Sequence, residues 1–455
     1  MKILLIQPPF EDFYATQIRL YPLGLIYVAG VFEQFSHRVE IIDCVPPLKK
    51  PRIPVPDEFN YLKAALQQKP YFFKHYFHFG IPEAEIADRI KKFQPDLIGI
   101  TANFTAYYRS VDQLAKWIRS GFDIPIFIGG NHATVFTKEI RERTPEIDFI
   151  LPGPAEQSIP VFLSSPAGKK LPARPVLWQN LMPAHHLLNG GNYQIGKKNY
   201  ISLTASRGCP FTCDFCNVHK MFGRKMVYRD ATHVVAEMEW NFREKGVRIF
   251  NFEDDNLTLN RKWLTAFLDN VSQSPVLRDI EMTAMNGICY PTLNAEILHK
   301  MKTAGFKRIN FSFVTKNLYL RRTHNRPGTG KESDNFERIV TAALDLGFMV
   351  TVYIIIGLPE QSYKEIEQSV DYLFDLGVLV GPSVFYLPPG SKLFERLAIP
   401  PQIKNNWNMY RSSAFAVETE QLNREQLINL FCYVREKNKS SLADKTETEP
   451  HAARR

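Results

Sequence analysis

The sequence has few cysteines and no long apolar run. It contains six cysteines in 455 residues, and no apolar stretch approaches the ~18–20 residues of a membrane-spanning helix. The first apolar run has four residues and stops before Pro8 and Pro9, which is shorter than the ~7–15 residues of a signal-peptide core. A hydrophobic fraction of 45% and a charged fraction of 23% exclude a disordered chain, a collagen-like fibre and a small disulfide scaffold. We therefore expect a cytoplasmic globular protein without a membrane span.

The sequence also lacks internal repeats and any long block of basic residues. At roughly 150 residues per domain the chain has room for two or three domains. Its net charge of +9 could attract nucleic acid or an anionic surface, but the basic residues are spread along the chain, with small clusters only at 220–225 and 321–326. A basic solvated surface is the favoured interpretation, and nucleic acid is not the expected partner.

Half of the cysteines lie within eight residues, at Cys209, Cys213 and Cys216. In a reducing compartment such a cluster indicates metal or redox chemistry rather than disulfides. Zinc normally takes four ligands, and His219 would make a Cys3His site, so zinc stays open as an alternative. Iron–sulfur cubanes also take four ligands as a rule. Three local thiolates would leave one iron free to bind another molecule, which favours a catalytic cluster.

The stretch Ser206–Cys216, SRGCPFTCDFC, resembles the cluster loop of the radical S-adenosylmethionine (radical SAM) enzymes. The resemblance implies that Cys209, Cys213 and Cys216 bind a [4Fe-4S] cluster whose fourth iron chelates SAM. It also implies that Phe215 lies near the adenine. Reductive cleavage of SAM then gives a 5′-deoxyadenosyl radical that abstracts hydrogen.

Strands and helices alternate after this loop. Helical spacing and terminal glycines predict helices over 231–245, 261–272, 293–302, 333–346 and 364–376. Apolar runs predict strands over 200–205, 248–252, 280–284, 307–313, 348–356 and 378–385. This alternation predicts a parallel sheet with right-handed crossovers, which matches the partial (β/α)6 TIM-type barrel of the family. Ligands should gather at the carboxyl ends of its strands.

Polar residues follow several of these strands. The resemblance assigns SAM contacts to seven positions: Phe215, Glu253, Asp254, Asp255, Ser312, Thr315 and Gly357. Asp255 or Asn256 could instead cap the following helix. At the fourth strand Val314 stands where relatives often carry a glutamate, so the mode of SAM binding departs from the family there.

The first 150 residues predict a second α/β unit. Strands are expected over 2–6, 39–43, 96–101, 125–129 and 148–151, with helices over 23–35, 82–93, 108–119 and 137–143. This order predicts a flavodoxin-like, doubly wound domain with a ligand crevice at the strand ends.

The same region resembles the cobalamin (B12)-binding domain found in one branch of radical SAM enzymes. The resemblance assigns cobalamin contacts to Pro8, Pro9, Thr101, Gly129, Gly130 and His132. An Asp-x-His-x-x-Gly motif is absent, because Val45 stands where its histidine would be. Cobalamin would therefore lack a lower axial histidine from that motif. A structural role for His132 and an ordinary tight turn at Gly129 and Gly130 stay open as alternatives.

These patterns divide the chain into five parts. We expect a B12-binding-like domain over 1–155, a linker over 156–198, the radical SAM barrel over 199–400, a helical segment over 401–437 and a disordered tail over 438–455. An aromatic-rich insertion over 50–81 either packs in a core or covers a cofactor.

The resemblance implies an enzyme with a [4Fe-4S] cluster, SAM and cobalamin. The expected reaction is methyl transfer to an unactivated carbon of a small-molecule or lipid-like substrate, with an external electron donor of the flavodoxin or ferredoxin type. A cobalamin-independent rearrangement, oxidation or cyclisation is the alternative. An RNA-modifying methylthiotransferase is less favoured, because the N-terminal domain offers only Cys44 for a second cluster.

Overall fold

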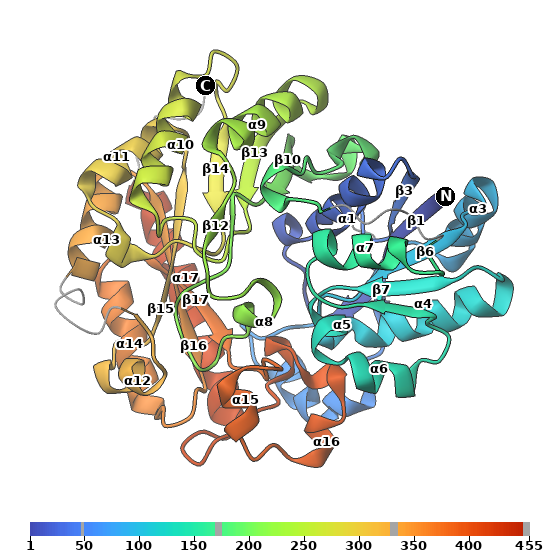
Figure 1. The fold of residues 1–455 in the computed structure, drawn as a ribbon. Coiled ribbons are helices and arrows are strands. Elements are labelled where there is room, and N and C mark those ends of the chain that lie inside the picture. The colour runs from blue at the N-terminus through green and yellow to red at the C-terminus, as the bar shows by residue number, and fades with distance from the viewer. Residues whose placement is uncertain (47–49, 169–174, 328–334, 449–455) are drawn as a thin grey trace.

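The computed structural model describes residues 1–46, 50–168, 175–327 and 335–448. Two α/β domains stand side by side, the N-terminal one in blue and cyan and the second in green to orange (Figure 1). The C-terminal segment, in orange-red and red, passes below the domains at α15 (Lys392–Arg396) and α16 (Pro401–Lys404) (Figure 1). Its last helix packs against β17 (Leu379–Val384) and α14 (Tyr363–Asp375) of the second domain. None of the helices in the described residues is both long and apolar enough to cross a bilayer.

A parallel five-stranded sheet in the order β3-β1-β6-β7-β8 forms the N-terminal domain. Its strands are β1 (Lys2–Gln7), β3 (Arg38–Asp43), β6 (Leu97–Thr101), β7 (Ile126–Gly129) and β8 (Phe149–Leu151). Its helices are α1 (Leu23–Gln34), α3 (Glu83–Phe93), α4 (Tyr108–Gly121), α5 (Asn131–Val135), α6 (Thr137–Arg143) and α7 (Ala155–Ser164). This is the flavodoxin-like order that the sequence predicts. The interior strand β1 carries apolar residues on both of its faces, because helices cover both faces of the sheet.

The second domain is the predicted partial barrel. Its parallel strands are β10 (Lys198–Leu203), β13 (Val247–Phe252), β14 (Glu281–Ala284), β15 (Arg308–Val314), β16 (Met349–Ile356) and β17 (Leu379–Val384). Its outer helices are α9 (Ala231–Lys245), α10 (Arg261–Gln273), α11 (Ala295–Thr303), α13 (Asn335–Asp345) and α14 (Tyr363–Asp375). The strand pairing is least extensive between β14 and β15, where a single bridge joins Met282 and Phe306. The first two residues of the helix predicted over 333–346 lie outside the described residues.

The insertion over 50–81 packs in a core. Its strand β5 (Tyr76–Phe79) pairs antiparallel with β2 (Phe10–Asp12) on one side and with β4 (Arg52–Ile53) on the other, and α2 (Lys63–Gln68) lies between β4 and β5 in the chain. The buried Phe72 ring lies 5.2 Å from Phe415 and 6.1 Å from Phe431. The insertion thus joins the N-terminal domain to the C-terminal segment.

Two of the domain boundaries predicted from the sequence differ from the structure: the start of the linker and the start of the disordered tail. Helix α7 lies inside the predicted linker, but it packs against α1, so it continues the N-terminal domain. At the other end α17 (Arg424–Thr448) runs past 437, where a disordered tail was predicted. Asn438 explains this extension, because its amide side chain bonds both the N–H (3.0 Å) and the C=O (2.7 Å) of Val380 at the open edge of β17. Residues 449–455 of the predicted tail lie outside the described residues.

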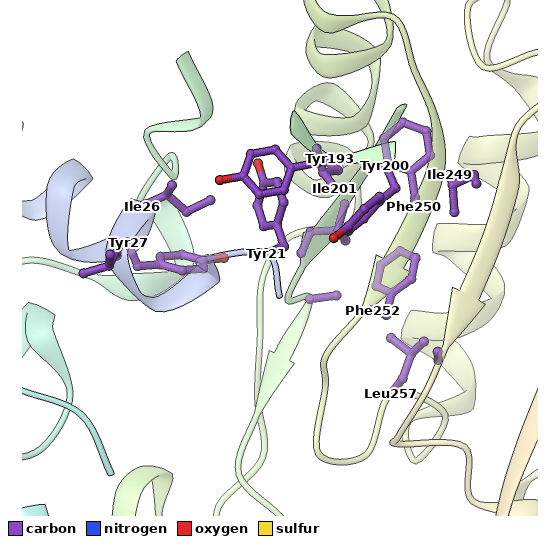
Figure 2. Close-up of a cluster of buried hydrophobic side chains, with 14 of the residues drawn as sticks. Tyr21, Ile26, Tyr27, Tyr193, Tyr200, Ile201, Ile249, Phe250, Phe252 and Leu257 are labelled. Atoms are coloured by element: carbon purple, nitrogen blue, oxygen red, sulfur yellow. The ribbon is translucent and has the colours of Figure 1, made fainter. Parts of the chain in front are cut away.

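The two domains share a buried interface of tyrosines. Tyr21 from the N-terminal domain packs against Tyr193 and against Tyr200 of β10, with ring centroids 4.8 and 6.2 Å away, and Tyr27 lies on the other side of Tyr21 (Figure 2). The Tyr21 hydroxyl lies 2.6 Å from His185, whose second ring nitrogen lies 2.8 Å from a carboxylate oxygen of Glu237. Because all of these groups are buried and hydrogen-bonded, they fix the relative position of the domains.

Glu237 also pairs with the buried Arg229 at 2.5 Å, and this pairing helps to hold the pKa of Glu237 below its ordinary value despite the burial that opposes it. Removing one member of such a pair would leave a buried charge without a partner.

His132 lies in the core of the N-terminal domain. Its ring is enclosed by Tyr108, Phe136 and Trp407, with centroids 4.5–5.0 Å away. The Thr105 hydroxyl lies 3.0 Å from Nδ1, and the side chain is 1% exposed. Burial, with a smaller contribution from Arg143, lowers the pKa of His132 to about 3.

The unfolded chain protonates this histidine near its ordinary pKa of 6.5. Folding stability therefore falls as the pH drops from 6.5 towards 3, by up to about 1.4 kcal/mol per pH unit. We expect His132→Phe to reduce the stability loss between pH 7 and pH 5 by about 2 kcal/mol, measured by urea unfolding at both pH values. The exposed control His233→Phe should follow the wild type, and parallel pH curves for His132→Phe and the wild type would contradict the assignment.

Candidate active site between the two domains

The three clustered cysteines lie on a hairpin loop that leaves the first barrel strand. After β10 the chain forms β11 (Ser206–Arg207), passes through the cysteines and α8 (Val218–Phe222), and returns as β12 (Val227–Tyr228), which pairs antiparallel with β11. Gly208 has φ +88°, and a Cβ there would meet the Lys225 carbonyl at 2.5 Å. The loop is therefore closed at its base.

All three cysteines are free thiols. Burial and the neighbouring thiols raise the pKa of Cys209 and bring that of Cys216 to about 11, although hydrogen bonds oppose the rise. Neighbouring thiols resist ionisation because their negative charges would repel each other. A strongly cationic group between them removes this repulsion, and they then bind it as thiolates. The donor set therefore fits an iron–sulfur cluster.

Asp254 holds the entrance of this loop. Its carboxylate accepts hydrogen bonds from the N–H groups of Ala205 and Ser206 and from the Ser206 hydroxyl at 2.6 Å. It is 1% exposed, and burial raises its pKa to about 7 in spite of these bonds. Asp254 is thus a structural anchor of the loop, and its side chain is not directed at a ligand as the sequence-based assignment to SAM requires.

Its two neighbours point elsewhere. The Asp255 carboxylate accepts from the Gly208 N–H at 3.3 Å, and burial raises its pKa to about 6. Glu253 shares the lumen face with Asn251, whose amide donates to it at 2.6 Å. Of the three acidic residues, Glu253 is the one whose carboxylate faces the barrel interior.

Asp214, between the second and third cysteines, joins the loop to two distant segments. Its carboxylate lies 3.0 Å from Nδ1 of His324 and accepts from Arg396. Its backbone is also engaged, because Asp214 N–H donates to His324 O (3.2 Å) and Leu393 N–H donates to Asp214 O (2.8 Å). The loop is therefore held from α12 (Leu318–Thr323) on one side and α15 (Lys392–Arg396) on the other.

The predicted SAM contacts of the later strands divide into two groups. Phe215 packs against a small apolar cluster at the strand ends, formed by Val314, Leu358, Phe385 and Leu393. Ser312 is exposed at the bulged end of β15. Gly357, with φ +94° beyond β16, is buried, and a Cβ there would meet Leu427 at 2.8 Å. Thr315 is also buried, and its hydroxyl donates to Glu365, so it is occupied within the protein.

Val314 is unusual because it is β-branched and has φ +77°. Such a conformation costs on the order of 1–3 kcal/mol and is concentrated at functional sites. The strained residue stands where the family's glutamate is missing.

The carboxyl edge of the N-terminal sheet carries the predicted cobalamin contacts. Thr101, Gly129 and Gly130 lie at the ends of adjacent strands, and Pro8 and Pro9 follow β1. At Gly130, with φ +116°, a Cβ would meet the Asn103 side chain at 2.4 Å, so this glycine is required by the turn itself.

Several features of this edge suit a large flat ligand. Phe104 is 65% exposed after β6, and a Cβ at Gly153 after β8 would meet open space. Asn103 is exposed beside them. His132 is not available here, because its ring is enclosed in the core. The edge therefore fits cobalamin bound without His132 as a ligand.

The cysteine loop lies against this domain. Helix α8 contacts α5, and the Thr134 hydroxyl approaches the Met221 sulfur at 4.0 Å. Arg207, next to the loop, donates to the Glu156 carboxylate at 2.9 Å. Its guanidinium lies 4.3–4.9 Å from the ring centroids of three aromatic residues, Tyr27, Trp178 and Phe222.

This fold and this loop define an iron–sulfur enzyme in which a partial barrel is joined to a flavodoxin-like ligand domain. The Radical SAM superfamily profile matches residues 203–373, and the B12 binding domain profile matches residues 55–163. The chain thus carries a Radical SAM domain over 203–373 and a B12 binding domain over 55–163.

Two curated relatives cover most of this chain. An uncharacterized methyltransferase of Pyrococcus horikoshii is 26% identical over 94% of this chain and 90% of its own length. Cytidylyl-2-hydroxyethylphosphonate methyltransferase of Streptomyces wedmorensis is 23% identical over 83% of this chain and 77% of its own.

The fold is similar to that of TsrM from Kitasatospora setae, a radical S-adenosylmethionine methyltransferase. The structure with cobalamin and a [4Fe-4S] cluster has a TM-score of 0.62 at 16% identity, over 86% of this chain and 74% of TsrM. The structure with tryptophan and a SAM analogue has a TM-score of 0.63 over 93% and 84%.

Sequence analysis missed the groups that hold the site together. Asp214, Arg207 and Gln361 drew no functional assignment, although Gln361 accepts from the N–H groups of Gly357 and Leu358 at 2.9 and 2.8 Å. One signal was available for Asp254. If the alternation of β13 is continued past its end at Phe252, Asn251 and Glu253 fall on one face and Asp254 on the other.

We expect Cys213→Ala to lose the cluster and all SAM cleavage, because one of three thiolate ligands is removed. Iron per chain and 5′-deoxyadenosine formation are the measurements. The control Cys432→Ala removes a buried cysteine on α17 and should keep both. Iron retained by the Cys213 variant would make the ligand assignment wrong.

We expect Asp214→Asn to release the cluster faster. The change removes the negative charge that contacts Nδ1 of His324 and accepts from Arg396, and hydrogen bonds to charged groups contribute about 1.5–3 kcal/mol, so iron loss to a chelator should accelerate at least about tenfold. Glu395→Gln, an exposed change beside Arg396, is the matched control. Equal iron-loss rates in the two variants would show that Asp214 does not hold the loop.

Proposed function

We propose that this protein is a cobalamin-dependent radical SAM methyltransferase that acts on an unactivated carbon of a small-molecule or lipid-like substrate. The observation that carries this proposal is the contact of α8 with α5, because it brings the cysteine loop to the ligand edge of the B12-binding domain. A cluster and a cobalamin bound at these places would face a common space. The methyltransferases among the similar proteins support the same reaction class.

The protein's part in this reaction is positioning and enclosure. When bound, the cluster with SAM supplies a radical that removes hydrogen from carbon, and methylcobalamin supplies the methyl group. Cys209, Cys213 and Cys216 would hold the cluster. Phe215 would pack near the adenine, and Ser312 would lie at the exposed strand end beside it, while Gly357 is buried behind the strand ends.

On the cobalamin side, Phe104 and the turns at Gly130 and Gly153 would receive the macrocycle and its tail. Neither of the two candidate positions offers a histidine to cobalamin. Val45 stands where the motif's histidine would be, and the ring of His132 is enclosed in the core.

The substrate would enter the barrel lumen, which contains a chain of hydrogen-bonded polar side chains. Asn251 donates to Ser202 at 3.1 Å and to Glu253 at 2.6 Å. The Asn286 amide lies 3.4 Å from Glu253 and accepts from Arg19 of the N-terminal domain at 3.1 Å. These groups suit a substrate that presents hydrogen-bonding groups to the lumen.

A cobalamin-independent cyclisation or oxidation is the second candidate. The anaerobic magnesium-protoporphyrin IX monomethyl ester cyclase of Cereibacter sphaeroides is 23% identical over 74% of this chain. This chain spans 59% of the cyclase's length, so the likeness supports cyclisation as a reaction class and does not extend to the cyclase's product.

Cofactor content separates the two candidates. We expect anaerobically purified protein, reconstituted with iron and sulfide and treated with hydroxocobalamin, to retain about four iron atoms and about one cobalt atom per chain after desalting. SAM with a labelled methyl group should then label the substrate. Four iron atoms without cobalt would favour the second candidate.

A matched pair of variants tests the binding edge. Phe104→Asp should lower cobalt retention several-fold, because it places a charge under the macrocycle. Trp240→Asp changes an exposed aromatic residue on α9 and should retain cobalt. Equal retention by both variants would move cobalamin away from this edge.

A further inference from the structure

A group of basic side chains borders the outer face of the cysteine loop. We call it the basic collar, and its members come from the loop, from the end of α12 and from α15: Lys220, Arg224, Lys225, Arg322, Arg326, Lys392 and Arg396. An open groove of about 350 Å³ lies beside the loop, and two members of the collar, Arg322 and Arg326, line it. Pro210, Phe211 and Thr212 form one wall of the groove, and these two arginines form the other with Asn325 and Pro327.

Direct contacts tie the collar to the loop. Arg224 donates to the Phe211 carbonyl at 3.3 Å, and Arg396 donates to Asp214. The Lys220 stem would lie 3.2 Å from a Cβ at Gly390, just before α15. These groups therefore form one surface, although they come from three parts of the chain.

The collar has an excess of uncompensated positive charge. Lys220, Arg224, Lys225 and Lys392 are exposed and make no ion pair with a carboxylate of the described residues. The neighbouring His219 is affected by the positive charge of the collar. Its pKa is lowered by burial and then by Arg224, Lys220 and Lys392, with Glu395 as the opposing charge.

We propose that the basic collar is the docking surface of a small acidic electron-transfer protein, which reduces the cluster through the wall of the groove. The inference rests on the proposed function, because a cluster that cleaves SAM must receive an electron from outside. The donor protein is oxidised by one electron, and that electron reduces the cluster by one. No atoms are transferred.

The position of the groove supports this partner. Residues 210–212 separate the first two cysteines, so a redox centre seated in the groove is separated from the cluster only by the loop. Opposite charges on two proteins speed their encounter and orient them without requiring a tight complex. Such a transient complex suits a carrier that must leave after each electron.

A charge-reversal experiment tests the collar. The test variant is Lys220→Glu/Lys225→Glu/Lys392→Glu, and the control is Lys63→Glu/Lys91→Glu/Lys262→Glu, which changes the net charge equally at exposed sites elsewhere. Each reconstituted enzyme is assayed for 5′-deoxyadenosine formation with reduced flavodoxin, with reduced ferredoxin and with dithionite-reduced methyl viologen.

We expect the test variant to lose at least about tenfold in the protein-supported rate at low ionic strength, and to lose less at 0.5 M salt. With methyl viologen, a small cation, it should cleave SAM at least as fast as the wild type. The control should match the wild type with every reductant. An equal loss with methyl viologen, or no loss with either protein donor, would overturn the proposal.

Binding gives a readout that does not depend on SAM cleavage. Titration of the anaerobic enzyme with oxidised flavodoxin should show weaker binding to the test variant than to the control. If wild type binds flavodoxin through the collar but cleaves no SAM with any reductant, the proposed function fails and the docking surface stands. If the collar variant keeps donor binding but loses affinity for an RNA oligonucleotide, the collar serves nucleic acid and the proposal is wrong.

Discussion

The hydrogen bonds to the buried carboxylate of Asp254 are the interaction on which the site depends. They fix the turn at Ala205 and Ser206, where the first barrel strand becomes the cysteine loop. The loop carries its own ligands but has little regular structure, so its geometry comes from its attachments. Asp254 holds its start, Asp214 holds its middle, and α8 rests on the N-terminal domain.

These attachments explain why the two domains act as one unit. Arg207 lies one residue from the loop's glycine and reaches Glu156 at the start of α7. The tyrosines of the interface and the His185–Glu237–Arg229 group add contacts that would be costly to break. A radical generated on one side therefore meets a fixed partner surface on the other, which limits the directions in which it can react.

Much of the fold could be predicted from the sequence, because its strands and helices follow simple periodicities. The order of the N-terminal sheet and the barrel follow from alternation of strand and helix, and the cysteine spacing indicates the cluster. Long-range pairings could not be predicted. Glu156 and Arg207 are far apart in sequence, as are Asn438 and Val380, and neither pair forms a local pattern. The three adjacent acidic residues 253–255 look equivalent in the sequence, and only the structure shows that their side chains contact different groups.

The C-terminal helix has a consequence for how the chain matures. Phe431 on α17 completes the aromatic core of the insertion that begins near residue 50, so that core needs two segments that lie far apart in the chain. During synthesis the N-terminal domain leaves the ribosome long before this helix exists, and its insertion stays partly uncovered until α17 emerges. Cofactor loading that requires the assembled interface therefore follows the synthesis of α17, and the open intermediate exposes apolar surface until then.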